Sequence, residues 1–261
     1  MSTAYIHGGT DAREVARLEK QAAWTASFTF PRFDAKPGMR VLDLACGTGA
    51  MAARLLTTFP GISLVGVDLS RSQLAACRQH HPEVSVINGD GTRLPFADET
   101  FDRVHCSWML EHVPEPVKVL RDVHRVLRQS GGGCQFIEVD NWSLSTTPLL
   151  RDVHELLAKL NAAQAKAGGD PAIGPRLDQL FRAAGFRQVT LEPVLLHGTQ
   201  EDPVLLANFV DEFAEIFEGL DESLGATESA LIARASSQLR ALVNEPTADL
   251  RYTAWLARGL R

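Results

Sequence analysis

The fold is decided by residues 41–49, which read Val-Leu-Asp-Leu-Ala-Cys-Gly-Thr-Gly. The first four residues have the pattern of a buried strand, the glycines mark a tight turn, and a helix is expected over residues 50–59. A second apolar strand, expected over residues 63–67, ends at Asp68. Dinucleotide-type folds bind the ribose of an adenosine cofactor with this combination of strand, glycine turn, helix and acid. The stretch therefore predicts a nucleoside-binding α/β fold.

Strands and helices continue to alternate along the chain. Up to residue 140 we expect helices over 70–79 and 115–128, and strands over 84–88, 103–106 and 134–139. Short polar loops between such elements are typical of a parallel sheet with helices on both faces, so the sequence predicts a doubly wound α/β fold. Beyond residue 140 the expected elements are helices over 149–160 and 177–184, a strand over 187–194, helices over 203–219 and 227–243, and a strand over 250–257.

The chain shows no internal repeat and no low-complexity linker, so we expect one domain over residues 1–261. Within it, residues 1–36 are expected to form an N-terminal helical lid and residues 37–140 the cofactor-binding core. Residues 141–261 are expected to form the acceptor-side half. A helical insertion at about 197–245 is expected there, because the last strand must return to the sheet.

Composition excludes several classes of function. The 261 residues include 26 basic and 32 acidic ones, a net charge of −6, without the basic stripe that nucleic-acid binding requires. The four cysteines form no C-x-x-C pair, so neither a disulfide scaffold nor a metal site is expected. No segment reaches the roughly 20 apolar residues of a membrane span, and no signal peptide is evident. We expect a soluble, cytoplasmic protein, with a homodimer left open, that acts on a small molecule.

Acids at three successive strand ends select among adenosine cofactors. Asp43 lies just before the glycine turn, where its carboxylate would repel a pyrophosphate, and the turn has no lysine or arginine to compensate. The same carboxylate suits a ligand that carries an ammonium and a sulfonium. Asp68 can accept hydrogen bonds from ribose hydroxyls, and Asp90 can accept one from the adenine amine. These residues predict S-adenosylmethionine as the cofactor; the alternative is a strand-to-helix turn without a ligand.

An ordered set of motifs runs through residues 38–140. Its members lie at residues 41–49, 65–70, 88–96 with 101–104, 110–113 and 127–133. In this order they resemble the motifs of class I S-adenosylmethionine-dependent methyltransferases, of the ubiquinone/menaquinone-type and related small-molecule enzymes. The resemblance implies a Rossmann-like sheet of seven strands with the last one antiparallel. It also implies an acceptor pocket at the carboxyl ends of the strands.

The resemblance assigns roles position by position. It places Gly47 and Gly49 at the methionine end of the cofactor, Asp68 at the ribose hydroxyls, Leu69 beside the adenine, Asp90 with Gly91 at the adenine edge, and Ser107 under the methionyl part. An N-terminal helix folded over the cofactor would bring Tyr5, His7 or Trp24 near the site, and ordinary packing of that helix is the alternative for all three.

Candidates for a catalytic proton acceptor follow the fourth and fifth strands. His112 lies on the acceptor side, and histidine exchanges a proton near neutral pH. Its alternative role is a helix-start residue bonded to nearby backbone. Asp140 and Glu138 close the fifth strand and share one of its faces, so both face the pocket or neither does. The phenylalanines at positions 209, 213 and 217 recur every four residues. This spacing is more typical of a helix face packed into the core, a core stripe, than of a substrate-binding site.

These features predict methyl transfer to a small, fairly hydrophobic acceptor, with O-methylation favoured and a secondary metabolite as the substrate class. Residues 107–110, Ser-Trp-Met-Leu, differ from the Asn/Asp-Pro-Pro-aromatic tetrad of many nucleobase-methylating enzymes, which disfavours DNA and RNA. One alternative keeps the bound cofactor but uses it for cyclisation, decarboxylation or hydroxylation. A non-catalytic partner of another methyltransferase and an NAD-dependent reductase are the remaining alternatives.

Overall fold

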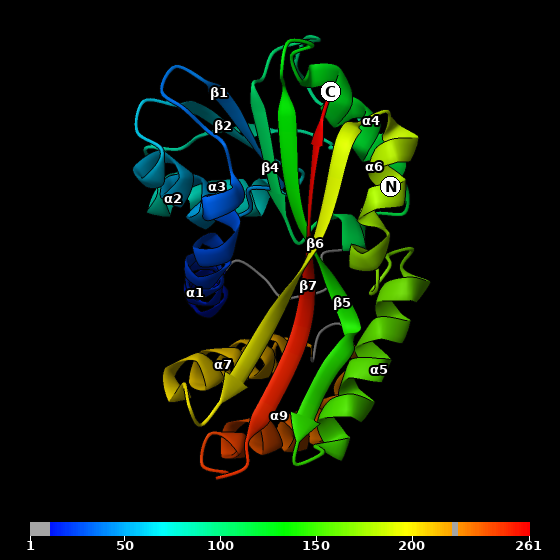
Figure 1. Cartoon of the computed structure of the whole chain (residues 1–261). Helices are drawn as coiled ribbons and strands as arrows, with labels where there is room; N and C mark the ends of the chain where they lie inside the picture. The colour runs from blue at the N-terminus through cyan, green and yellow to red at the C-terminus, as the bar shows by residue number, and fades with distance from the viewer. Residues whose placement is uncertain (1–10, 221–223) are drawn as a thin grey trace.

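The computed structural model of the chain describes residues 11–220 and 224–261, in which a seven-stranded sheet carries helices on both faces (Figure 1). The strands follow the order β3-β2-β1-β4-β5-β7-β6 across the sheet. Neighbours from β3 to β5 are parallel, whereas β7 is antiparallel to both β5 and β6. The strands are β1 (Arg40–Leu44), β2 (Ser63–Asp68), β3 (Ser85–Asn88), β4 (Arg103–Ser107), β5 (Gly133–Thr147), β6 (Arg187–Thr199) and β7 (Asp249–Leu260). The expected fold, including its antiparallel last strand, is confirmed.

Both faces of the central strands are buried. Val41 packs with apolar residues of α1, α2 and the start of β3, and Leu42 packs with those of α4 and α6. The two neighbours are fully buried on opposite faces because successive side chains of a strand alternate. The helices are α1 (Ala12–Thr29), α2 (Ala50–Thr58), α3 (Arg71–His80), α4 (Pro116–Val126), α5 (Arg151–Lys166), α6 (Leu177–Ala184), α7 (Pro203–Glu218) and α9 (Ser229–Leu242).

Strands β5, β6 and β7 are longer than the sequence predicted. Strand β5 was expected to end at residue 139 and reaches Thr147, and β6 continues to Thr199. In Figure 1 these strands run past the rest of the sheet, and α5, α7 and α9 pack together on this extension. The prediction failed here because residues 140–147 are mostly polar and the pairing with β7 slips between Asp140 and Ser145.

The expected helical insertion lies between β6 and β7 and begins after the last residue of β6. No helix in the described ranges is both long and apolar enough to cross a membrane.

Candidate functional site

The glycine turn joins β1 to α2 at the carboxyl end of the sheet. Its backbone enters the left-handed region at Gly47, with φ 52°, and at Gly49, with φ 86°. A Cβ at Gly49 would collide with Sγ of Cys77, so packing alone requires glycine there. Around a Cβ at Gly47, by contrast, the described residues place one heavy atom within 4 Å, Oε1 of Gln73 at 3.7 Å. The turn therefore leaves space beside Gly47 that a ligand can approach.

Two buried hydrogen-bond acceptors near this turn have no partner among the described residues: Oδ2 of Asp43 and Oε1 of Gln73. Asp43 is 2% exposed, and its Oδ1 lies 3.0 Å from Nδ1 of His105 on the neighbouring strand β4. Buried polar groups are nearly always hydrogen-bonded, so a ligand that carries hydrogen-bond donors would satisfy both oxygens. An ammonium brings donors, whereas a phosphate brings only acceptors. Gln73 has no sequence signal that would have singled it out.

Asp68 ends β2 beside the same turn. Its Oδ2 accepts a hydrogen bond from the backbone N of Gly47 at 3.0 Å, and its Oδ1 accepts one from that of Ser70 at 2.7 Å. Burial raises the pKa of Asp68 above its ordinary value of 3.8, and these backbone hydrogen bonds act against the rise. Leu69, the next residue, is 47% exposed. An acid next to an uncovered apolar side chain matches the ribose and base of a nucleoside.

Asp90, Gly91 and Ser107 lie at the ends of β3 and β4. Oδ1 of Asp90 accepts hydrogen bonds from the backbone N and from Oγ1 of Thr92, both at 2.8 Å, and the first of these lowers the pKa of Asp90. Oγ of Ser107 lies 3.4 Å from Nε2 of His105. The four adjacent parallel strands β3, β2, β1 and β4 thus bring the residues selected from sequence to one edge of the sheet.

Comparison with known proteins relates the central part of the chain to a known family. Residues 41–131 match the family described as a methyltransferase domain. A demethylmenaquinone methyltransferase of Beutenbergia cavernae is 38% identical over 118 residues, which cover 45% of this chain and 48% of that protein. One of Paenarthrobacter aurescens is 33% identical over 152 residues, 58% of each protein. Residues 41–131 therefore form a methyltransferase domain, and the sheet has the fold of class I S-adenosylmethionine-dependent methyltransferases.

The matched part of the chain spans about half the length of these curated relatives. Among solved structures, a putative methyltransferase from an antibiotic biosynthesis pathway of Anabaena variabilis superposes with a TM-score of 0.64. The alignment covers 90% of this chain and 96% of that one at 17% identity, which shows the shared fold. The cyclase SpnF has the same fold, with a TM-score of 0.58 and 22% identity over 98% of this chain and 88% of its own.

A cavity of about 90 Å³ adjoins β4 and β5 and is bounded by α1, α5 and α7. Aromatic side chains make up much of its wall: Trp24, Trp108, Phe209, Phe213, Phe217 and Tyr252. Phe209 and Phe217 also lie in the hydrophobic core beneath α7, as expected, but Phe209, Phe213 and Phe217 line the cavity as well, so the alternative of a substrate site stays open. Of the three N-terminal candidates, Trp24 is in the wall, whereas Tyr5 and His7 lie outside the described residues.

One part of the cavity wall is polar. It contains Glu111, His112, Asn141 and Tyr252. Oε2 of Glu111 accepts a hydrogen bond from Nε2 of Gln164 at 2.7 Å, and its Oε1 lies 3.7 Å from Nε2 of His112. The hydroxyl of Tyr252 donates to Oδ1 of Asn141 at 2.9 Å. The wall thus offers a carboxylate and an imidazole to whatever occupies the cavity.

Glu138, on β5, supports the short helix Leu110–His112 that carries these two groups. Its carboxyl group is fully buried and accepts hydrogen bonds from the backbone N of Met109 at 3.1 Å, Leu110 at 2.8 Å and Glu111 at 3.3 Å. Burial and, second, the nearby charge of Glu111 raise the pKa of Glu138 to about 8. Glu138 itself does not line the cavity in the described part of the chain.

The raised pKa of Glu138 predicts a pH-dependent stability. Between its ordinary value of 4.5 and about 8 the folded state holds a proton that the unfolded state has released, so stability falls as pH rises through this window. Glu138→Gln removes this dependence. From pH 5.5 to 7.5 the unfolding free energy of the wild type should fall relative to that of Glu138→Gln by about 1–3 kcal/mol, measured by urea titration. A constant difference between the two proteins would contradict the prediction.

The two catalytic candidates from sequence are placed differently. His112 is in the cavity wall, but Asp140 is not; the wall instead contains its neighbours Val139 and Asn141, whose side chains lie on the other face of β5. Sequence reasoning missed Glu111, although it stands next to His112 in a recognised motif. It also missed Tyr252, because nothing local in the last strand indicates a site.

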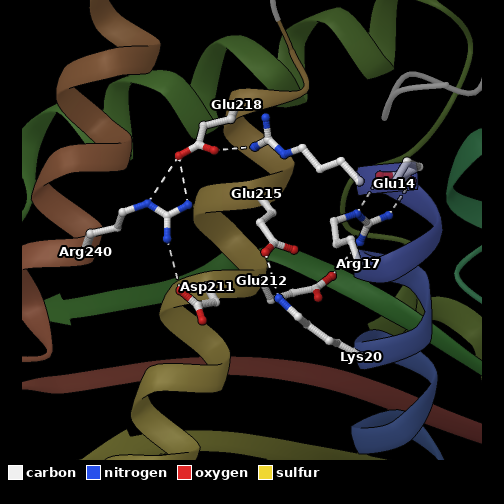
Figure 2. A network of polar contacts seen from close by, with 9 residues as sticks. Glu14, Arg17, Lys20, Asp211, Glu212, Glu215, Glu218 and Arg240 are labelled. Carbon is white, nitrogen blue, oxygen red and sulfur yellow. Dashed lines mark hydrogen bonds and ion pairs between the residues drawn. The ribbon is translucent and has the colours of Figure 1, made fainter. Parts of the chain in front are cut away.

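Ion pairs join α1 to α7 beside the cavity (Figure 2). The pairs are Arg13–Glu218, Arg17–Glu212 and Lys20–Glu215. Nη1 of Arg17 lies 2.6 Å from Oε1 of Glu212, and the two side chains are only 3% and 7% exposed. Burial raises the pKa of Glu212, and the charge of Arg17 opposes the rise. On the far side of α7, Arg240 of α9 binds Glu218 and Asp211, which fixes α7 in turn.

Proposed function

We propose that this chain binds S-adenosylmethionine at the glycine turn and catalyses transfer of its methyl group to a small, hydrophobic acceptor in the aromatic cavity, whose wall includes Trp108, the residue after Ser107. The observation that supports the cofactor best is the pair of buried oxygens, Oδ2 of Asp43 and Oε1 of Gln73, which lie near an open glycine turn and have no partner in the described part of the chain. These groups require a ligand that donates hydrogen bonds, as an ammonium does. When bound, the cofactor supplies an electrophilic methyl group on a positively charged sulfur.

The residues at the strand ends fit the parts of this cofactor. Asp43 and Gln73 would hold the ammonium, Gly47 and Gly49 the methionine backbone, Ser107 the methionyl chain, Asp68 the ribose hydroxyls, Leu69 a face of the adenine, and Asp90 with Gly91 its edge. Each of these side chains or backbone groups matches a donor, an acceptor or an apolar face of the ligand.

The acceptor would occupy the aromatic cavity, with α1 as a lid. The cavity of about 90 Å³ is smaller than the about 150 Å³ cavity that holds a benzene molecule, so we expect a wall to move when a ring enters. Helix α1 is the wall that moves in this proposal; ion pairs and the contact between the rings of Trp24 and Phe209 connect it to α7. Its return would exclude water and align the acceptor with the methyl group.

Glu111 and His112 support an oxygen as the methylated atom. A hydroxyl acceptor becomes a better nucleophile when a nearby group takes its proton, and both side chains line the cavity. Carbon is the competing atom, since a sterol 24-C-methyltransferase of Schizosaccharomyces pombe is 31% identical over 157 residues, 57% of this chain and 39% of that protein.

Glu111→Gln is expected to lower the methylation rate of a phenolic acceptor about 100-fold, because the amide cannot take the proton. The affinity for S-adenosylmethionine should stay unchanged, since Glu111 is assigned no contact with the cofactor. The measurement is formation of S-adenosylhomocysteine, with calorimetric titration of the cofactor alongside. The matched control is Glu115→Gln, an exposed glutamate at the start of α4, which should behave as wild type. Equal rates for Glu111→Gln and wild type would exclude this role.

The same assay separates methyl transfer from the non-methylating alternative. A protein that binds S-adenosylmethionine but converts a substrate without releasing S-adenosylhomocysteine would use the cofactor as a fixed charge. A protein that binds NAD and not S-adenosylmethionine would contradict the proposal entirely.

A further inference from the structure

We propose that the cavity recognises a neutral aromatic compound with a hydroxyl group at one end and a carbonyl oxygen at the other. The inference rests on the proposed function, because this compound is the methyl acceptor. The aromatic part follows from the walls: the ring centroid of Trp24 lies 6.0 Å from that of Trp108 and 5.9 Å from that of Phe209. Such walls favour a flat ring that stacks or packs edge to face.

The hydroxyl is required by Glu111. Two carboxylates line the cavity, and they differ in their partners. Oε1 of Glu212 accepts hydrogen bonds from Arg17 at 2.6 Å and from Gln21 at 2.8 Å, so a guanidinium neutralises this carboxylate. Among the described residues, Glu111 accepts a hydrogen bond from the uncharged Gln164 on Oε2, while Nε2 of His112 lies 3.7 Å from Oε1, beyond hydrogen-bond distance. A ligand hydroxyl would donate to this oxygen.

The carbonyl oxygen is required by Trp24. Its Nε1 is buried and has no hydrogen-bond partner among the described residues, whereas Nε1 of Trp108 lies 3.4 Å from Oγ1 of Thr25. An indole N–H can only donate, and because Trp24 lines the cavity, an acceptor on the ligand would pair with it. A carboxylate on the ligand would be repelled by Glu111, and a neutral carbonyl meets the requirement without this cost.

Four single-ring probes test the two requirements: para-hydroxyacetophenone, para-ethylphenol, acetophenone and benzylamine. Each is titrated calorimetrically into the full chain saturated with S-adenosylhomocysteine. We expect para-hydroxyacetophenone to bind about tenfold more tightly than para-ethylphenol or acetophenone, which each lack one polar group. Trp24→Phe should weaken the binding of para-hydroxyacetophenone about tenfold and leave the affinity for para-ethylphenol unchanged. Glu111→Gln should weaken the binding of para-hydroxyacetophenone by a similar factor and leave the affinity for acetophenone unchanged.

Trp255→Phe is the matched control. Nε1 of Trp255 is also buried without a partner, but Trp255 does not line the cavity, so this variant should bind all probes as wild type does. Equal affinities for the first three probes, or equal effects of Trp24→Phe and Trp255→Phe, would overturn the inference while leaving the proposed function intact. Tighter binding of benzylamine would show a cationic acceptor instead. A chain that does not bind S-adenosylhomocysteine at all would overturn both proposals.

Discussion

Asp68→Ala is expected to weaken S-adenosylmethionine binding at least 100-fold. In the proposed complex the Asp68 carboxylate accepts hydrogen bonds from two ribose hydroxyls, and a hydrogen bond to a charged group contributes about 1.5–3 kcal/mol. Since about 1.4 kcal/mol corresponds to a tenfold change in affinity, two such bonds account for a loss of this size. Calorimetric titration of the cofactor into each purified protein gives the dissociation constants directly.

Two further variants separate this contact from an effect on the turn. Asp68 also accepts backbone hydrogen bonds from Gly47 and Ser70, so alanine removes support from the loop itself. Asp68→Asn keeps one carbonyl oxygen, and we expect a loss of about tenfold with little change in the unfolding midpoint. Asp98→Ala, at an exposed aspartate 2.9 Å from Arg125, should leave affinity unaltered. A wild-type affinity in Asp68→Ala would contradict the assignment of the ribose.

The cofactor half of the molecule was predictable because its signals are local. Val41 and Leu42 belong to an apolar run whose burial on both faces is typical of a parallel strand, and the glycines of the turn follow at once. The carboxyl ends of parallel strands share one edge of the sheet. The positions of Asp43 and Asp68 in sequence therefore sufficed to bring them together.

The acceptor half could not be predicted in the same way. Its cavity combines Trp24 of α1, Glu111 of the turn after β4, Phe209 of α7 and Tyr252 of β7, which meet only through tertiary packing. The extension of β5 that supports the cavity consists mostly of polar residues, and its pairing with β7 slips between Asp140 and Ser145. For Asp140, the alternation of side chains along β5 predicted only that Glu138 lies on the same face. Which face of β5 lines the cavity depends on how α5 and α7 pack, and the sequence did not reveal this.

Arg17→Met is expected to lower the unfolding free energy by about 3–5 kcal/mol near pH 8, because it leaves the carboxylate of Glu212 buried without its cationic partner. Burial already raises the pKa of Glu212, and removal of Arg17 removes the main opposing charge, so this pKa rises further. The variant then takes up a proton on folding, and its stability declines as pH increases from the ordinary glutamate value toward the raised one. The loss should therefore be smaller at pH 5 than at pH 8, which urea titrations at both values measure.

The controls for this prediction use the neighbouring pair and the double variant. Lys20→Met breaks an ion pair whose lysine is 59% exposed, and it should cost less than about 1 kcal/mol at either pH. Arg17→Met combined with Glu212→Met removes the buried pair and should recover part of the stability; the recovery is incomplete because Glu14, 11% exposed, also loses its bonds to Arg17. If Arg17→Met were no worse than Lys20→Met, or equally destabilising at both pH values, the buried pair would not be what holds α1 against α7. In that case the position of the lid would depend on the aromatic contacts of Trp24, and its opening would be insensitive to salt.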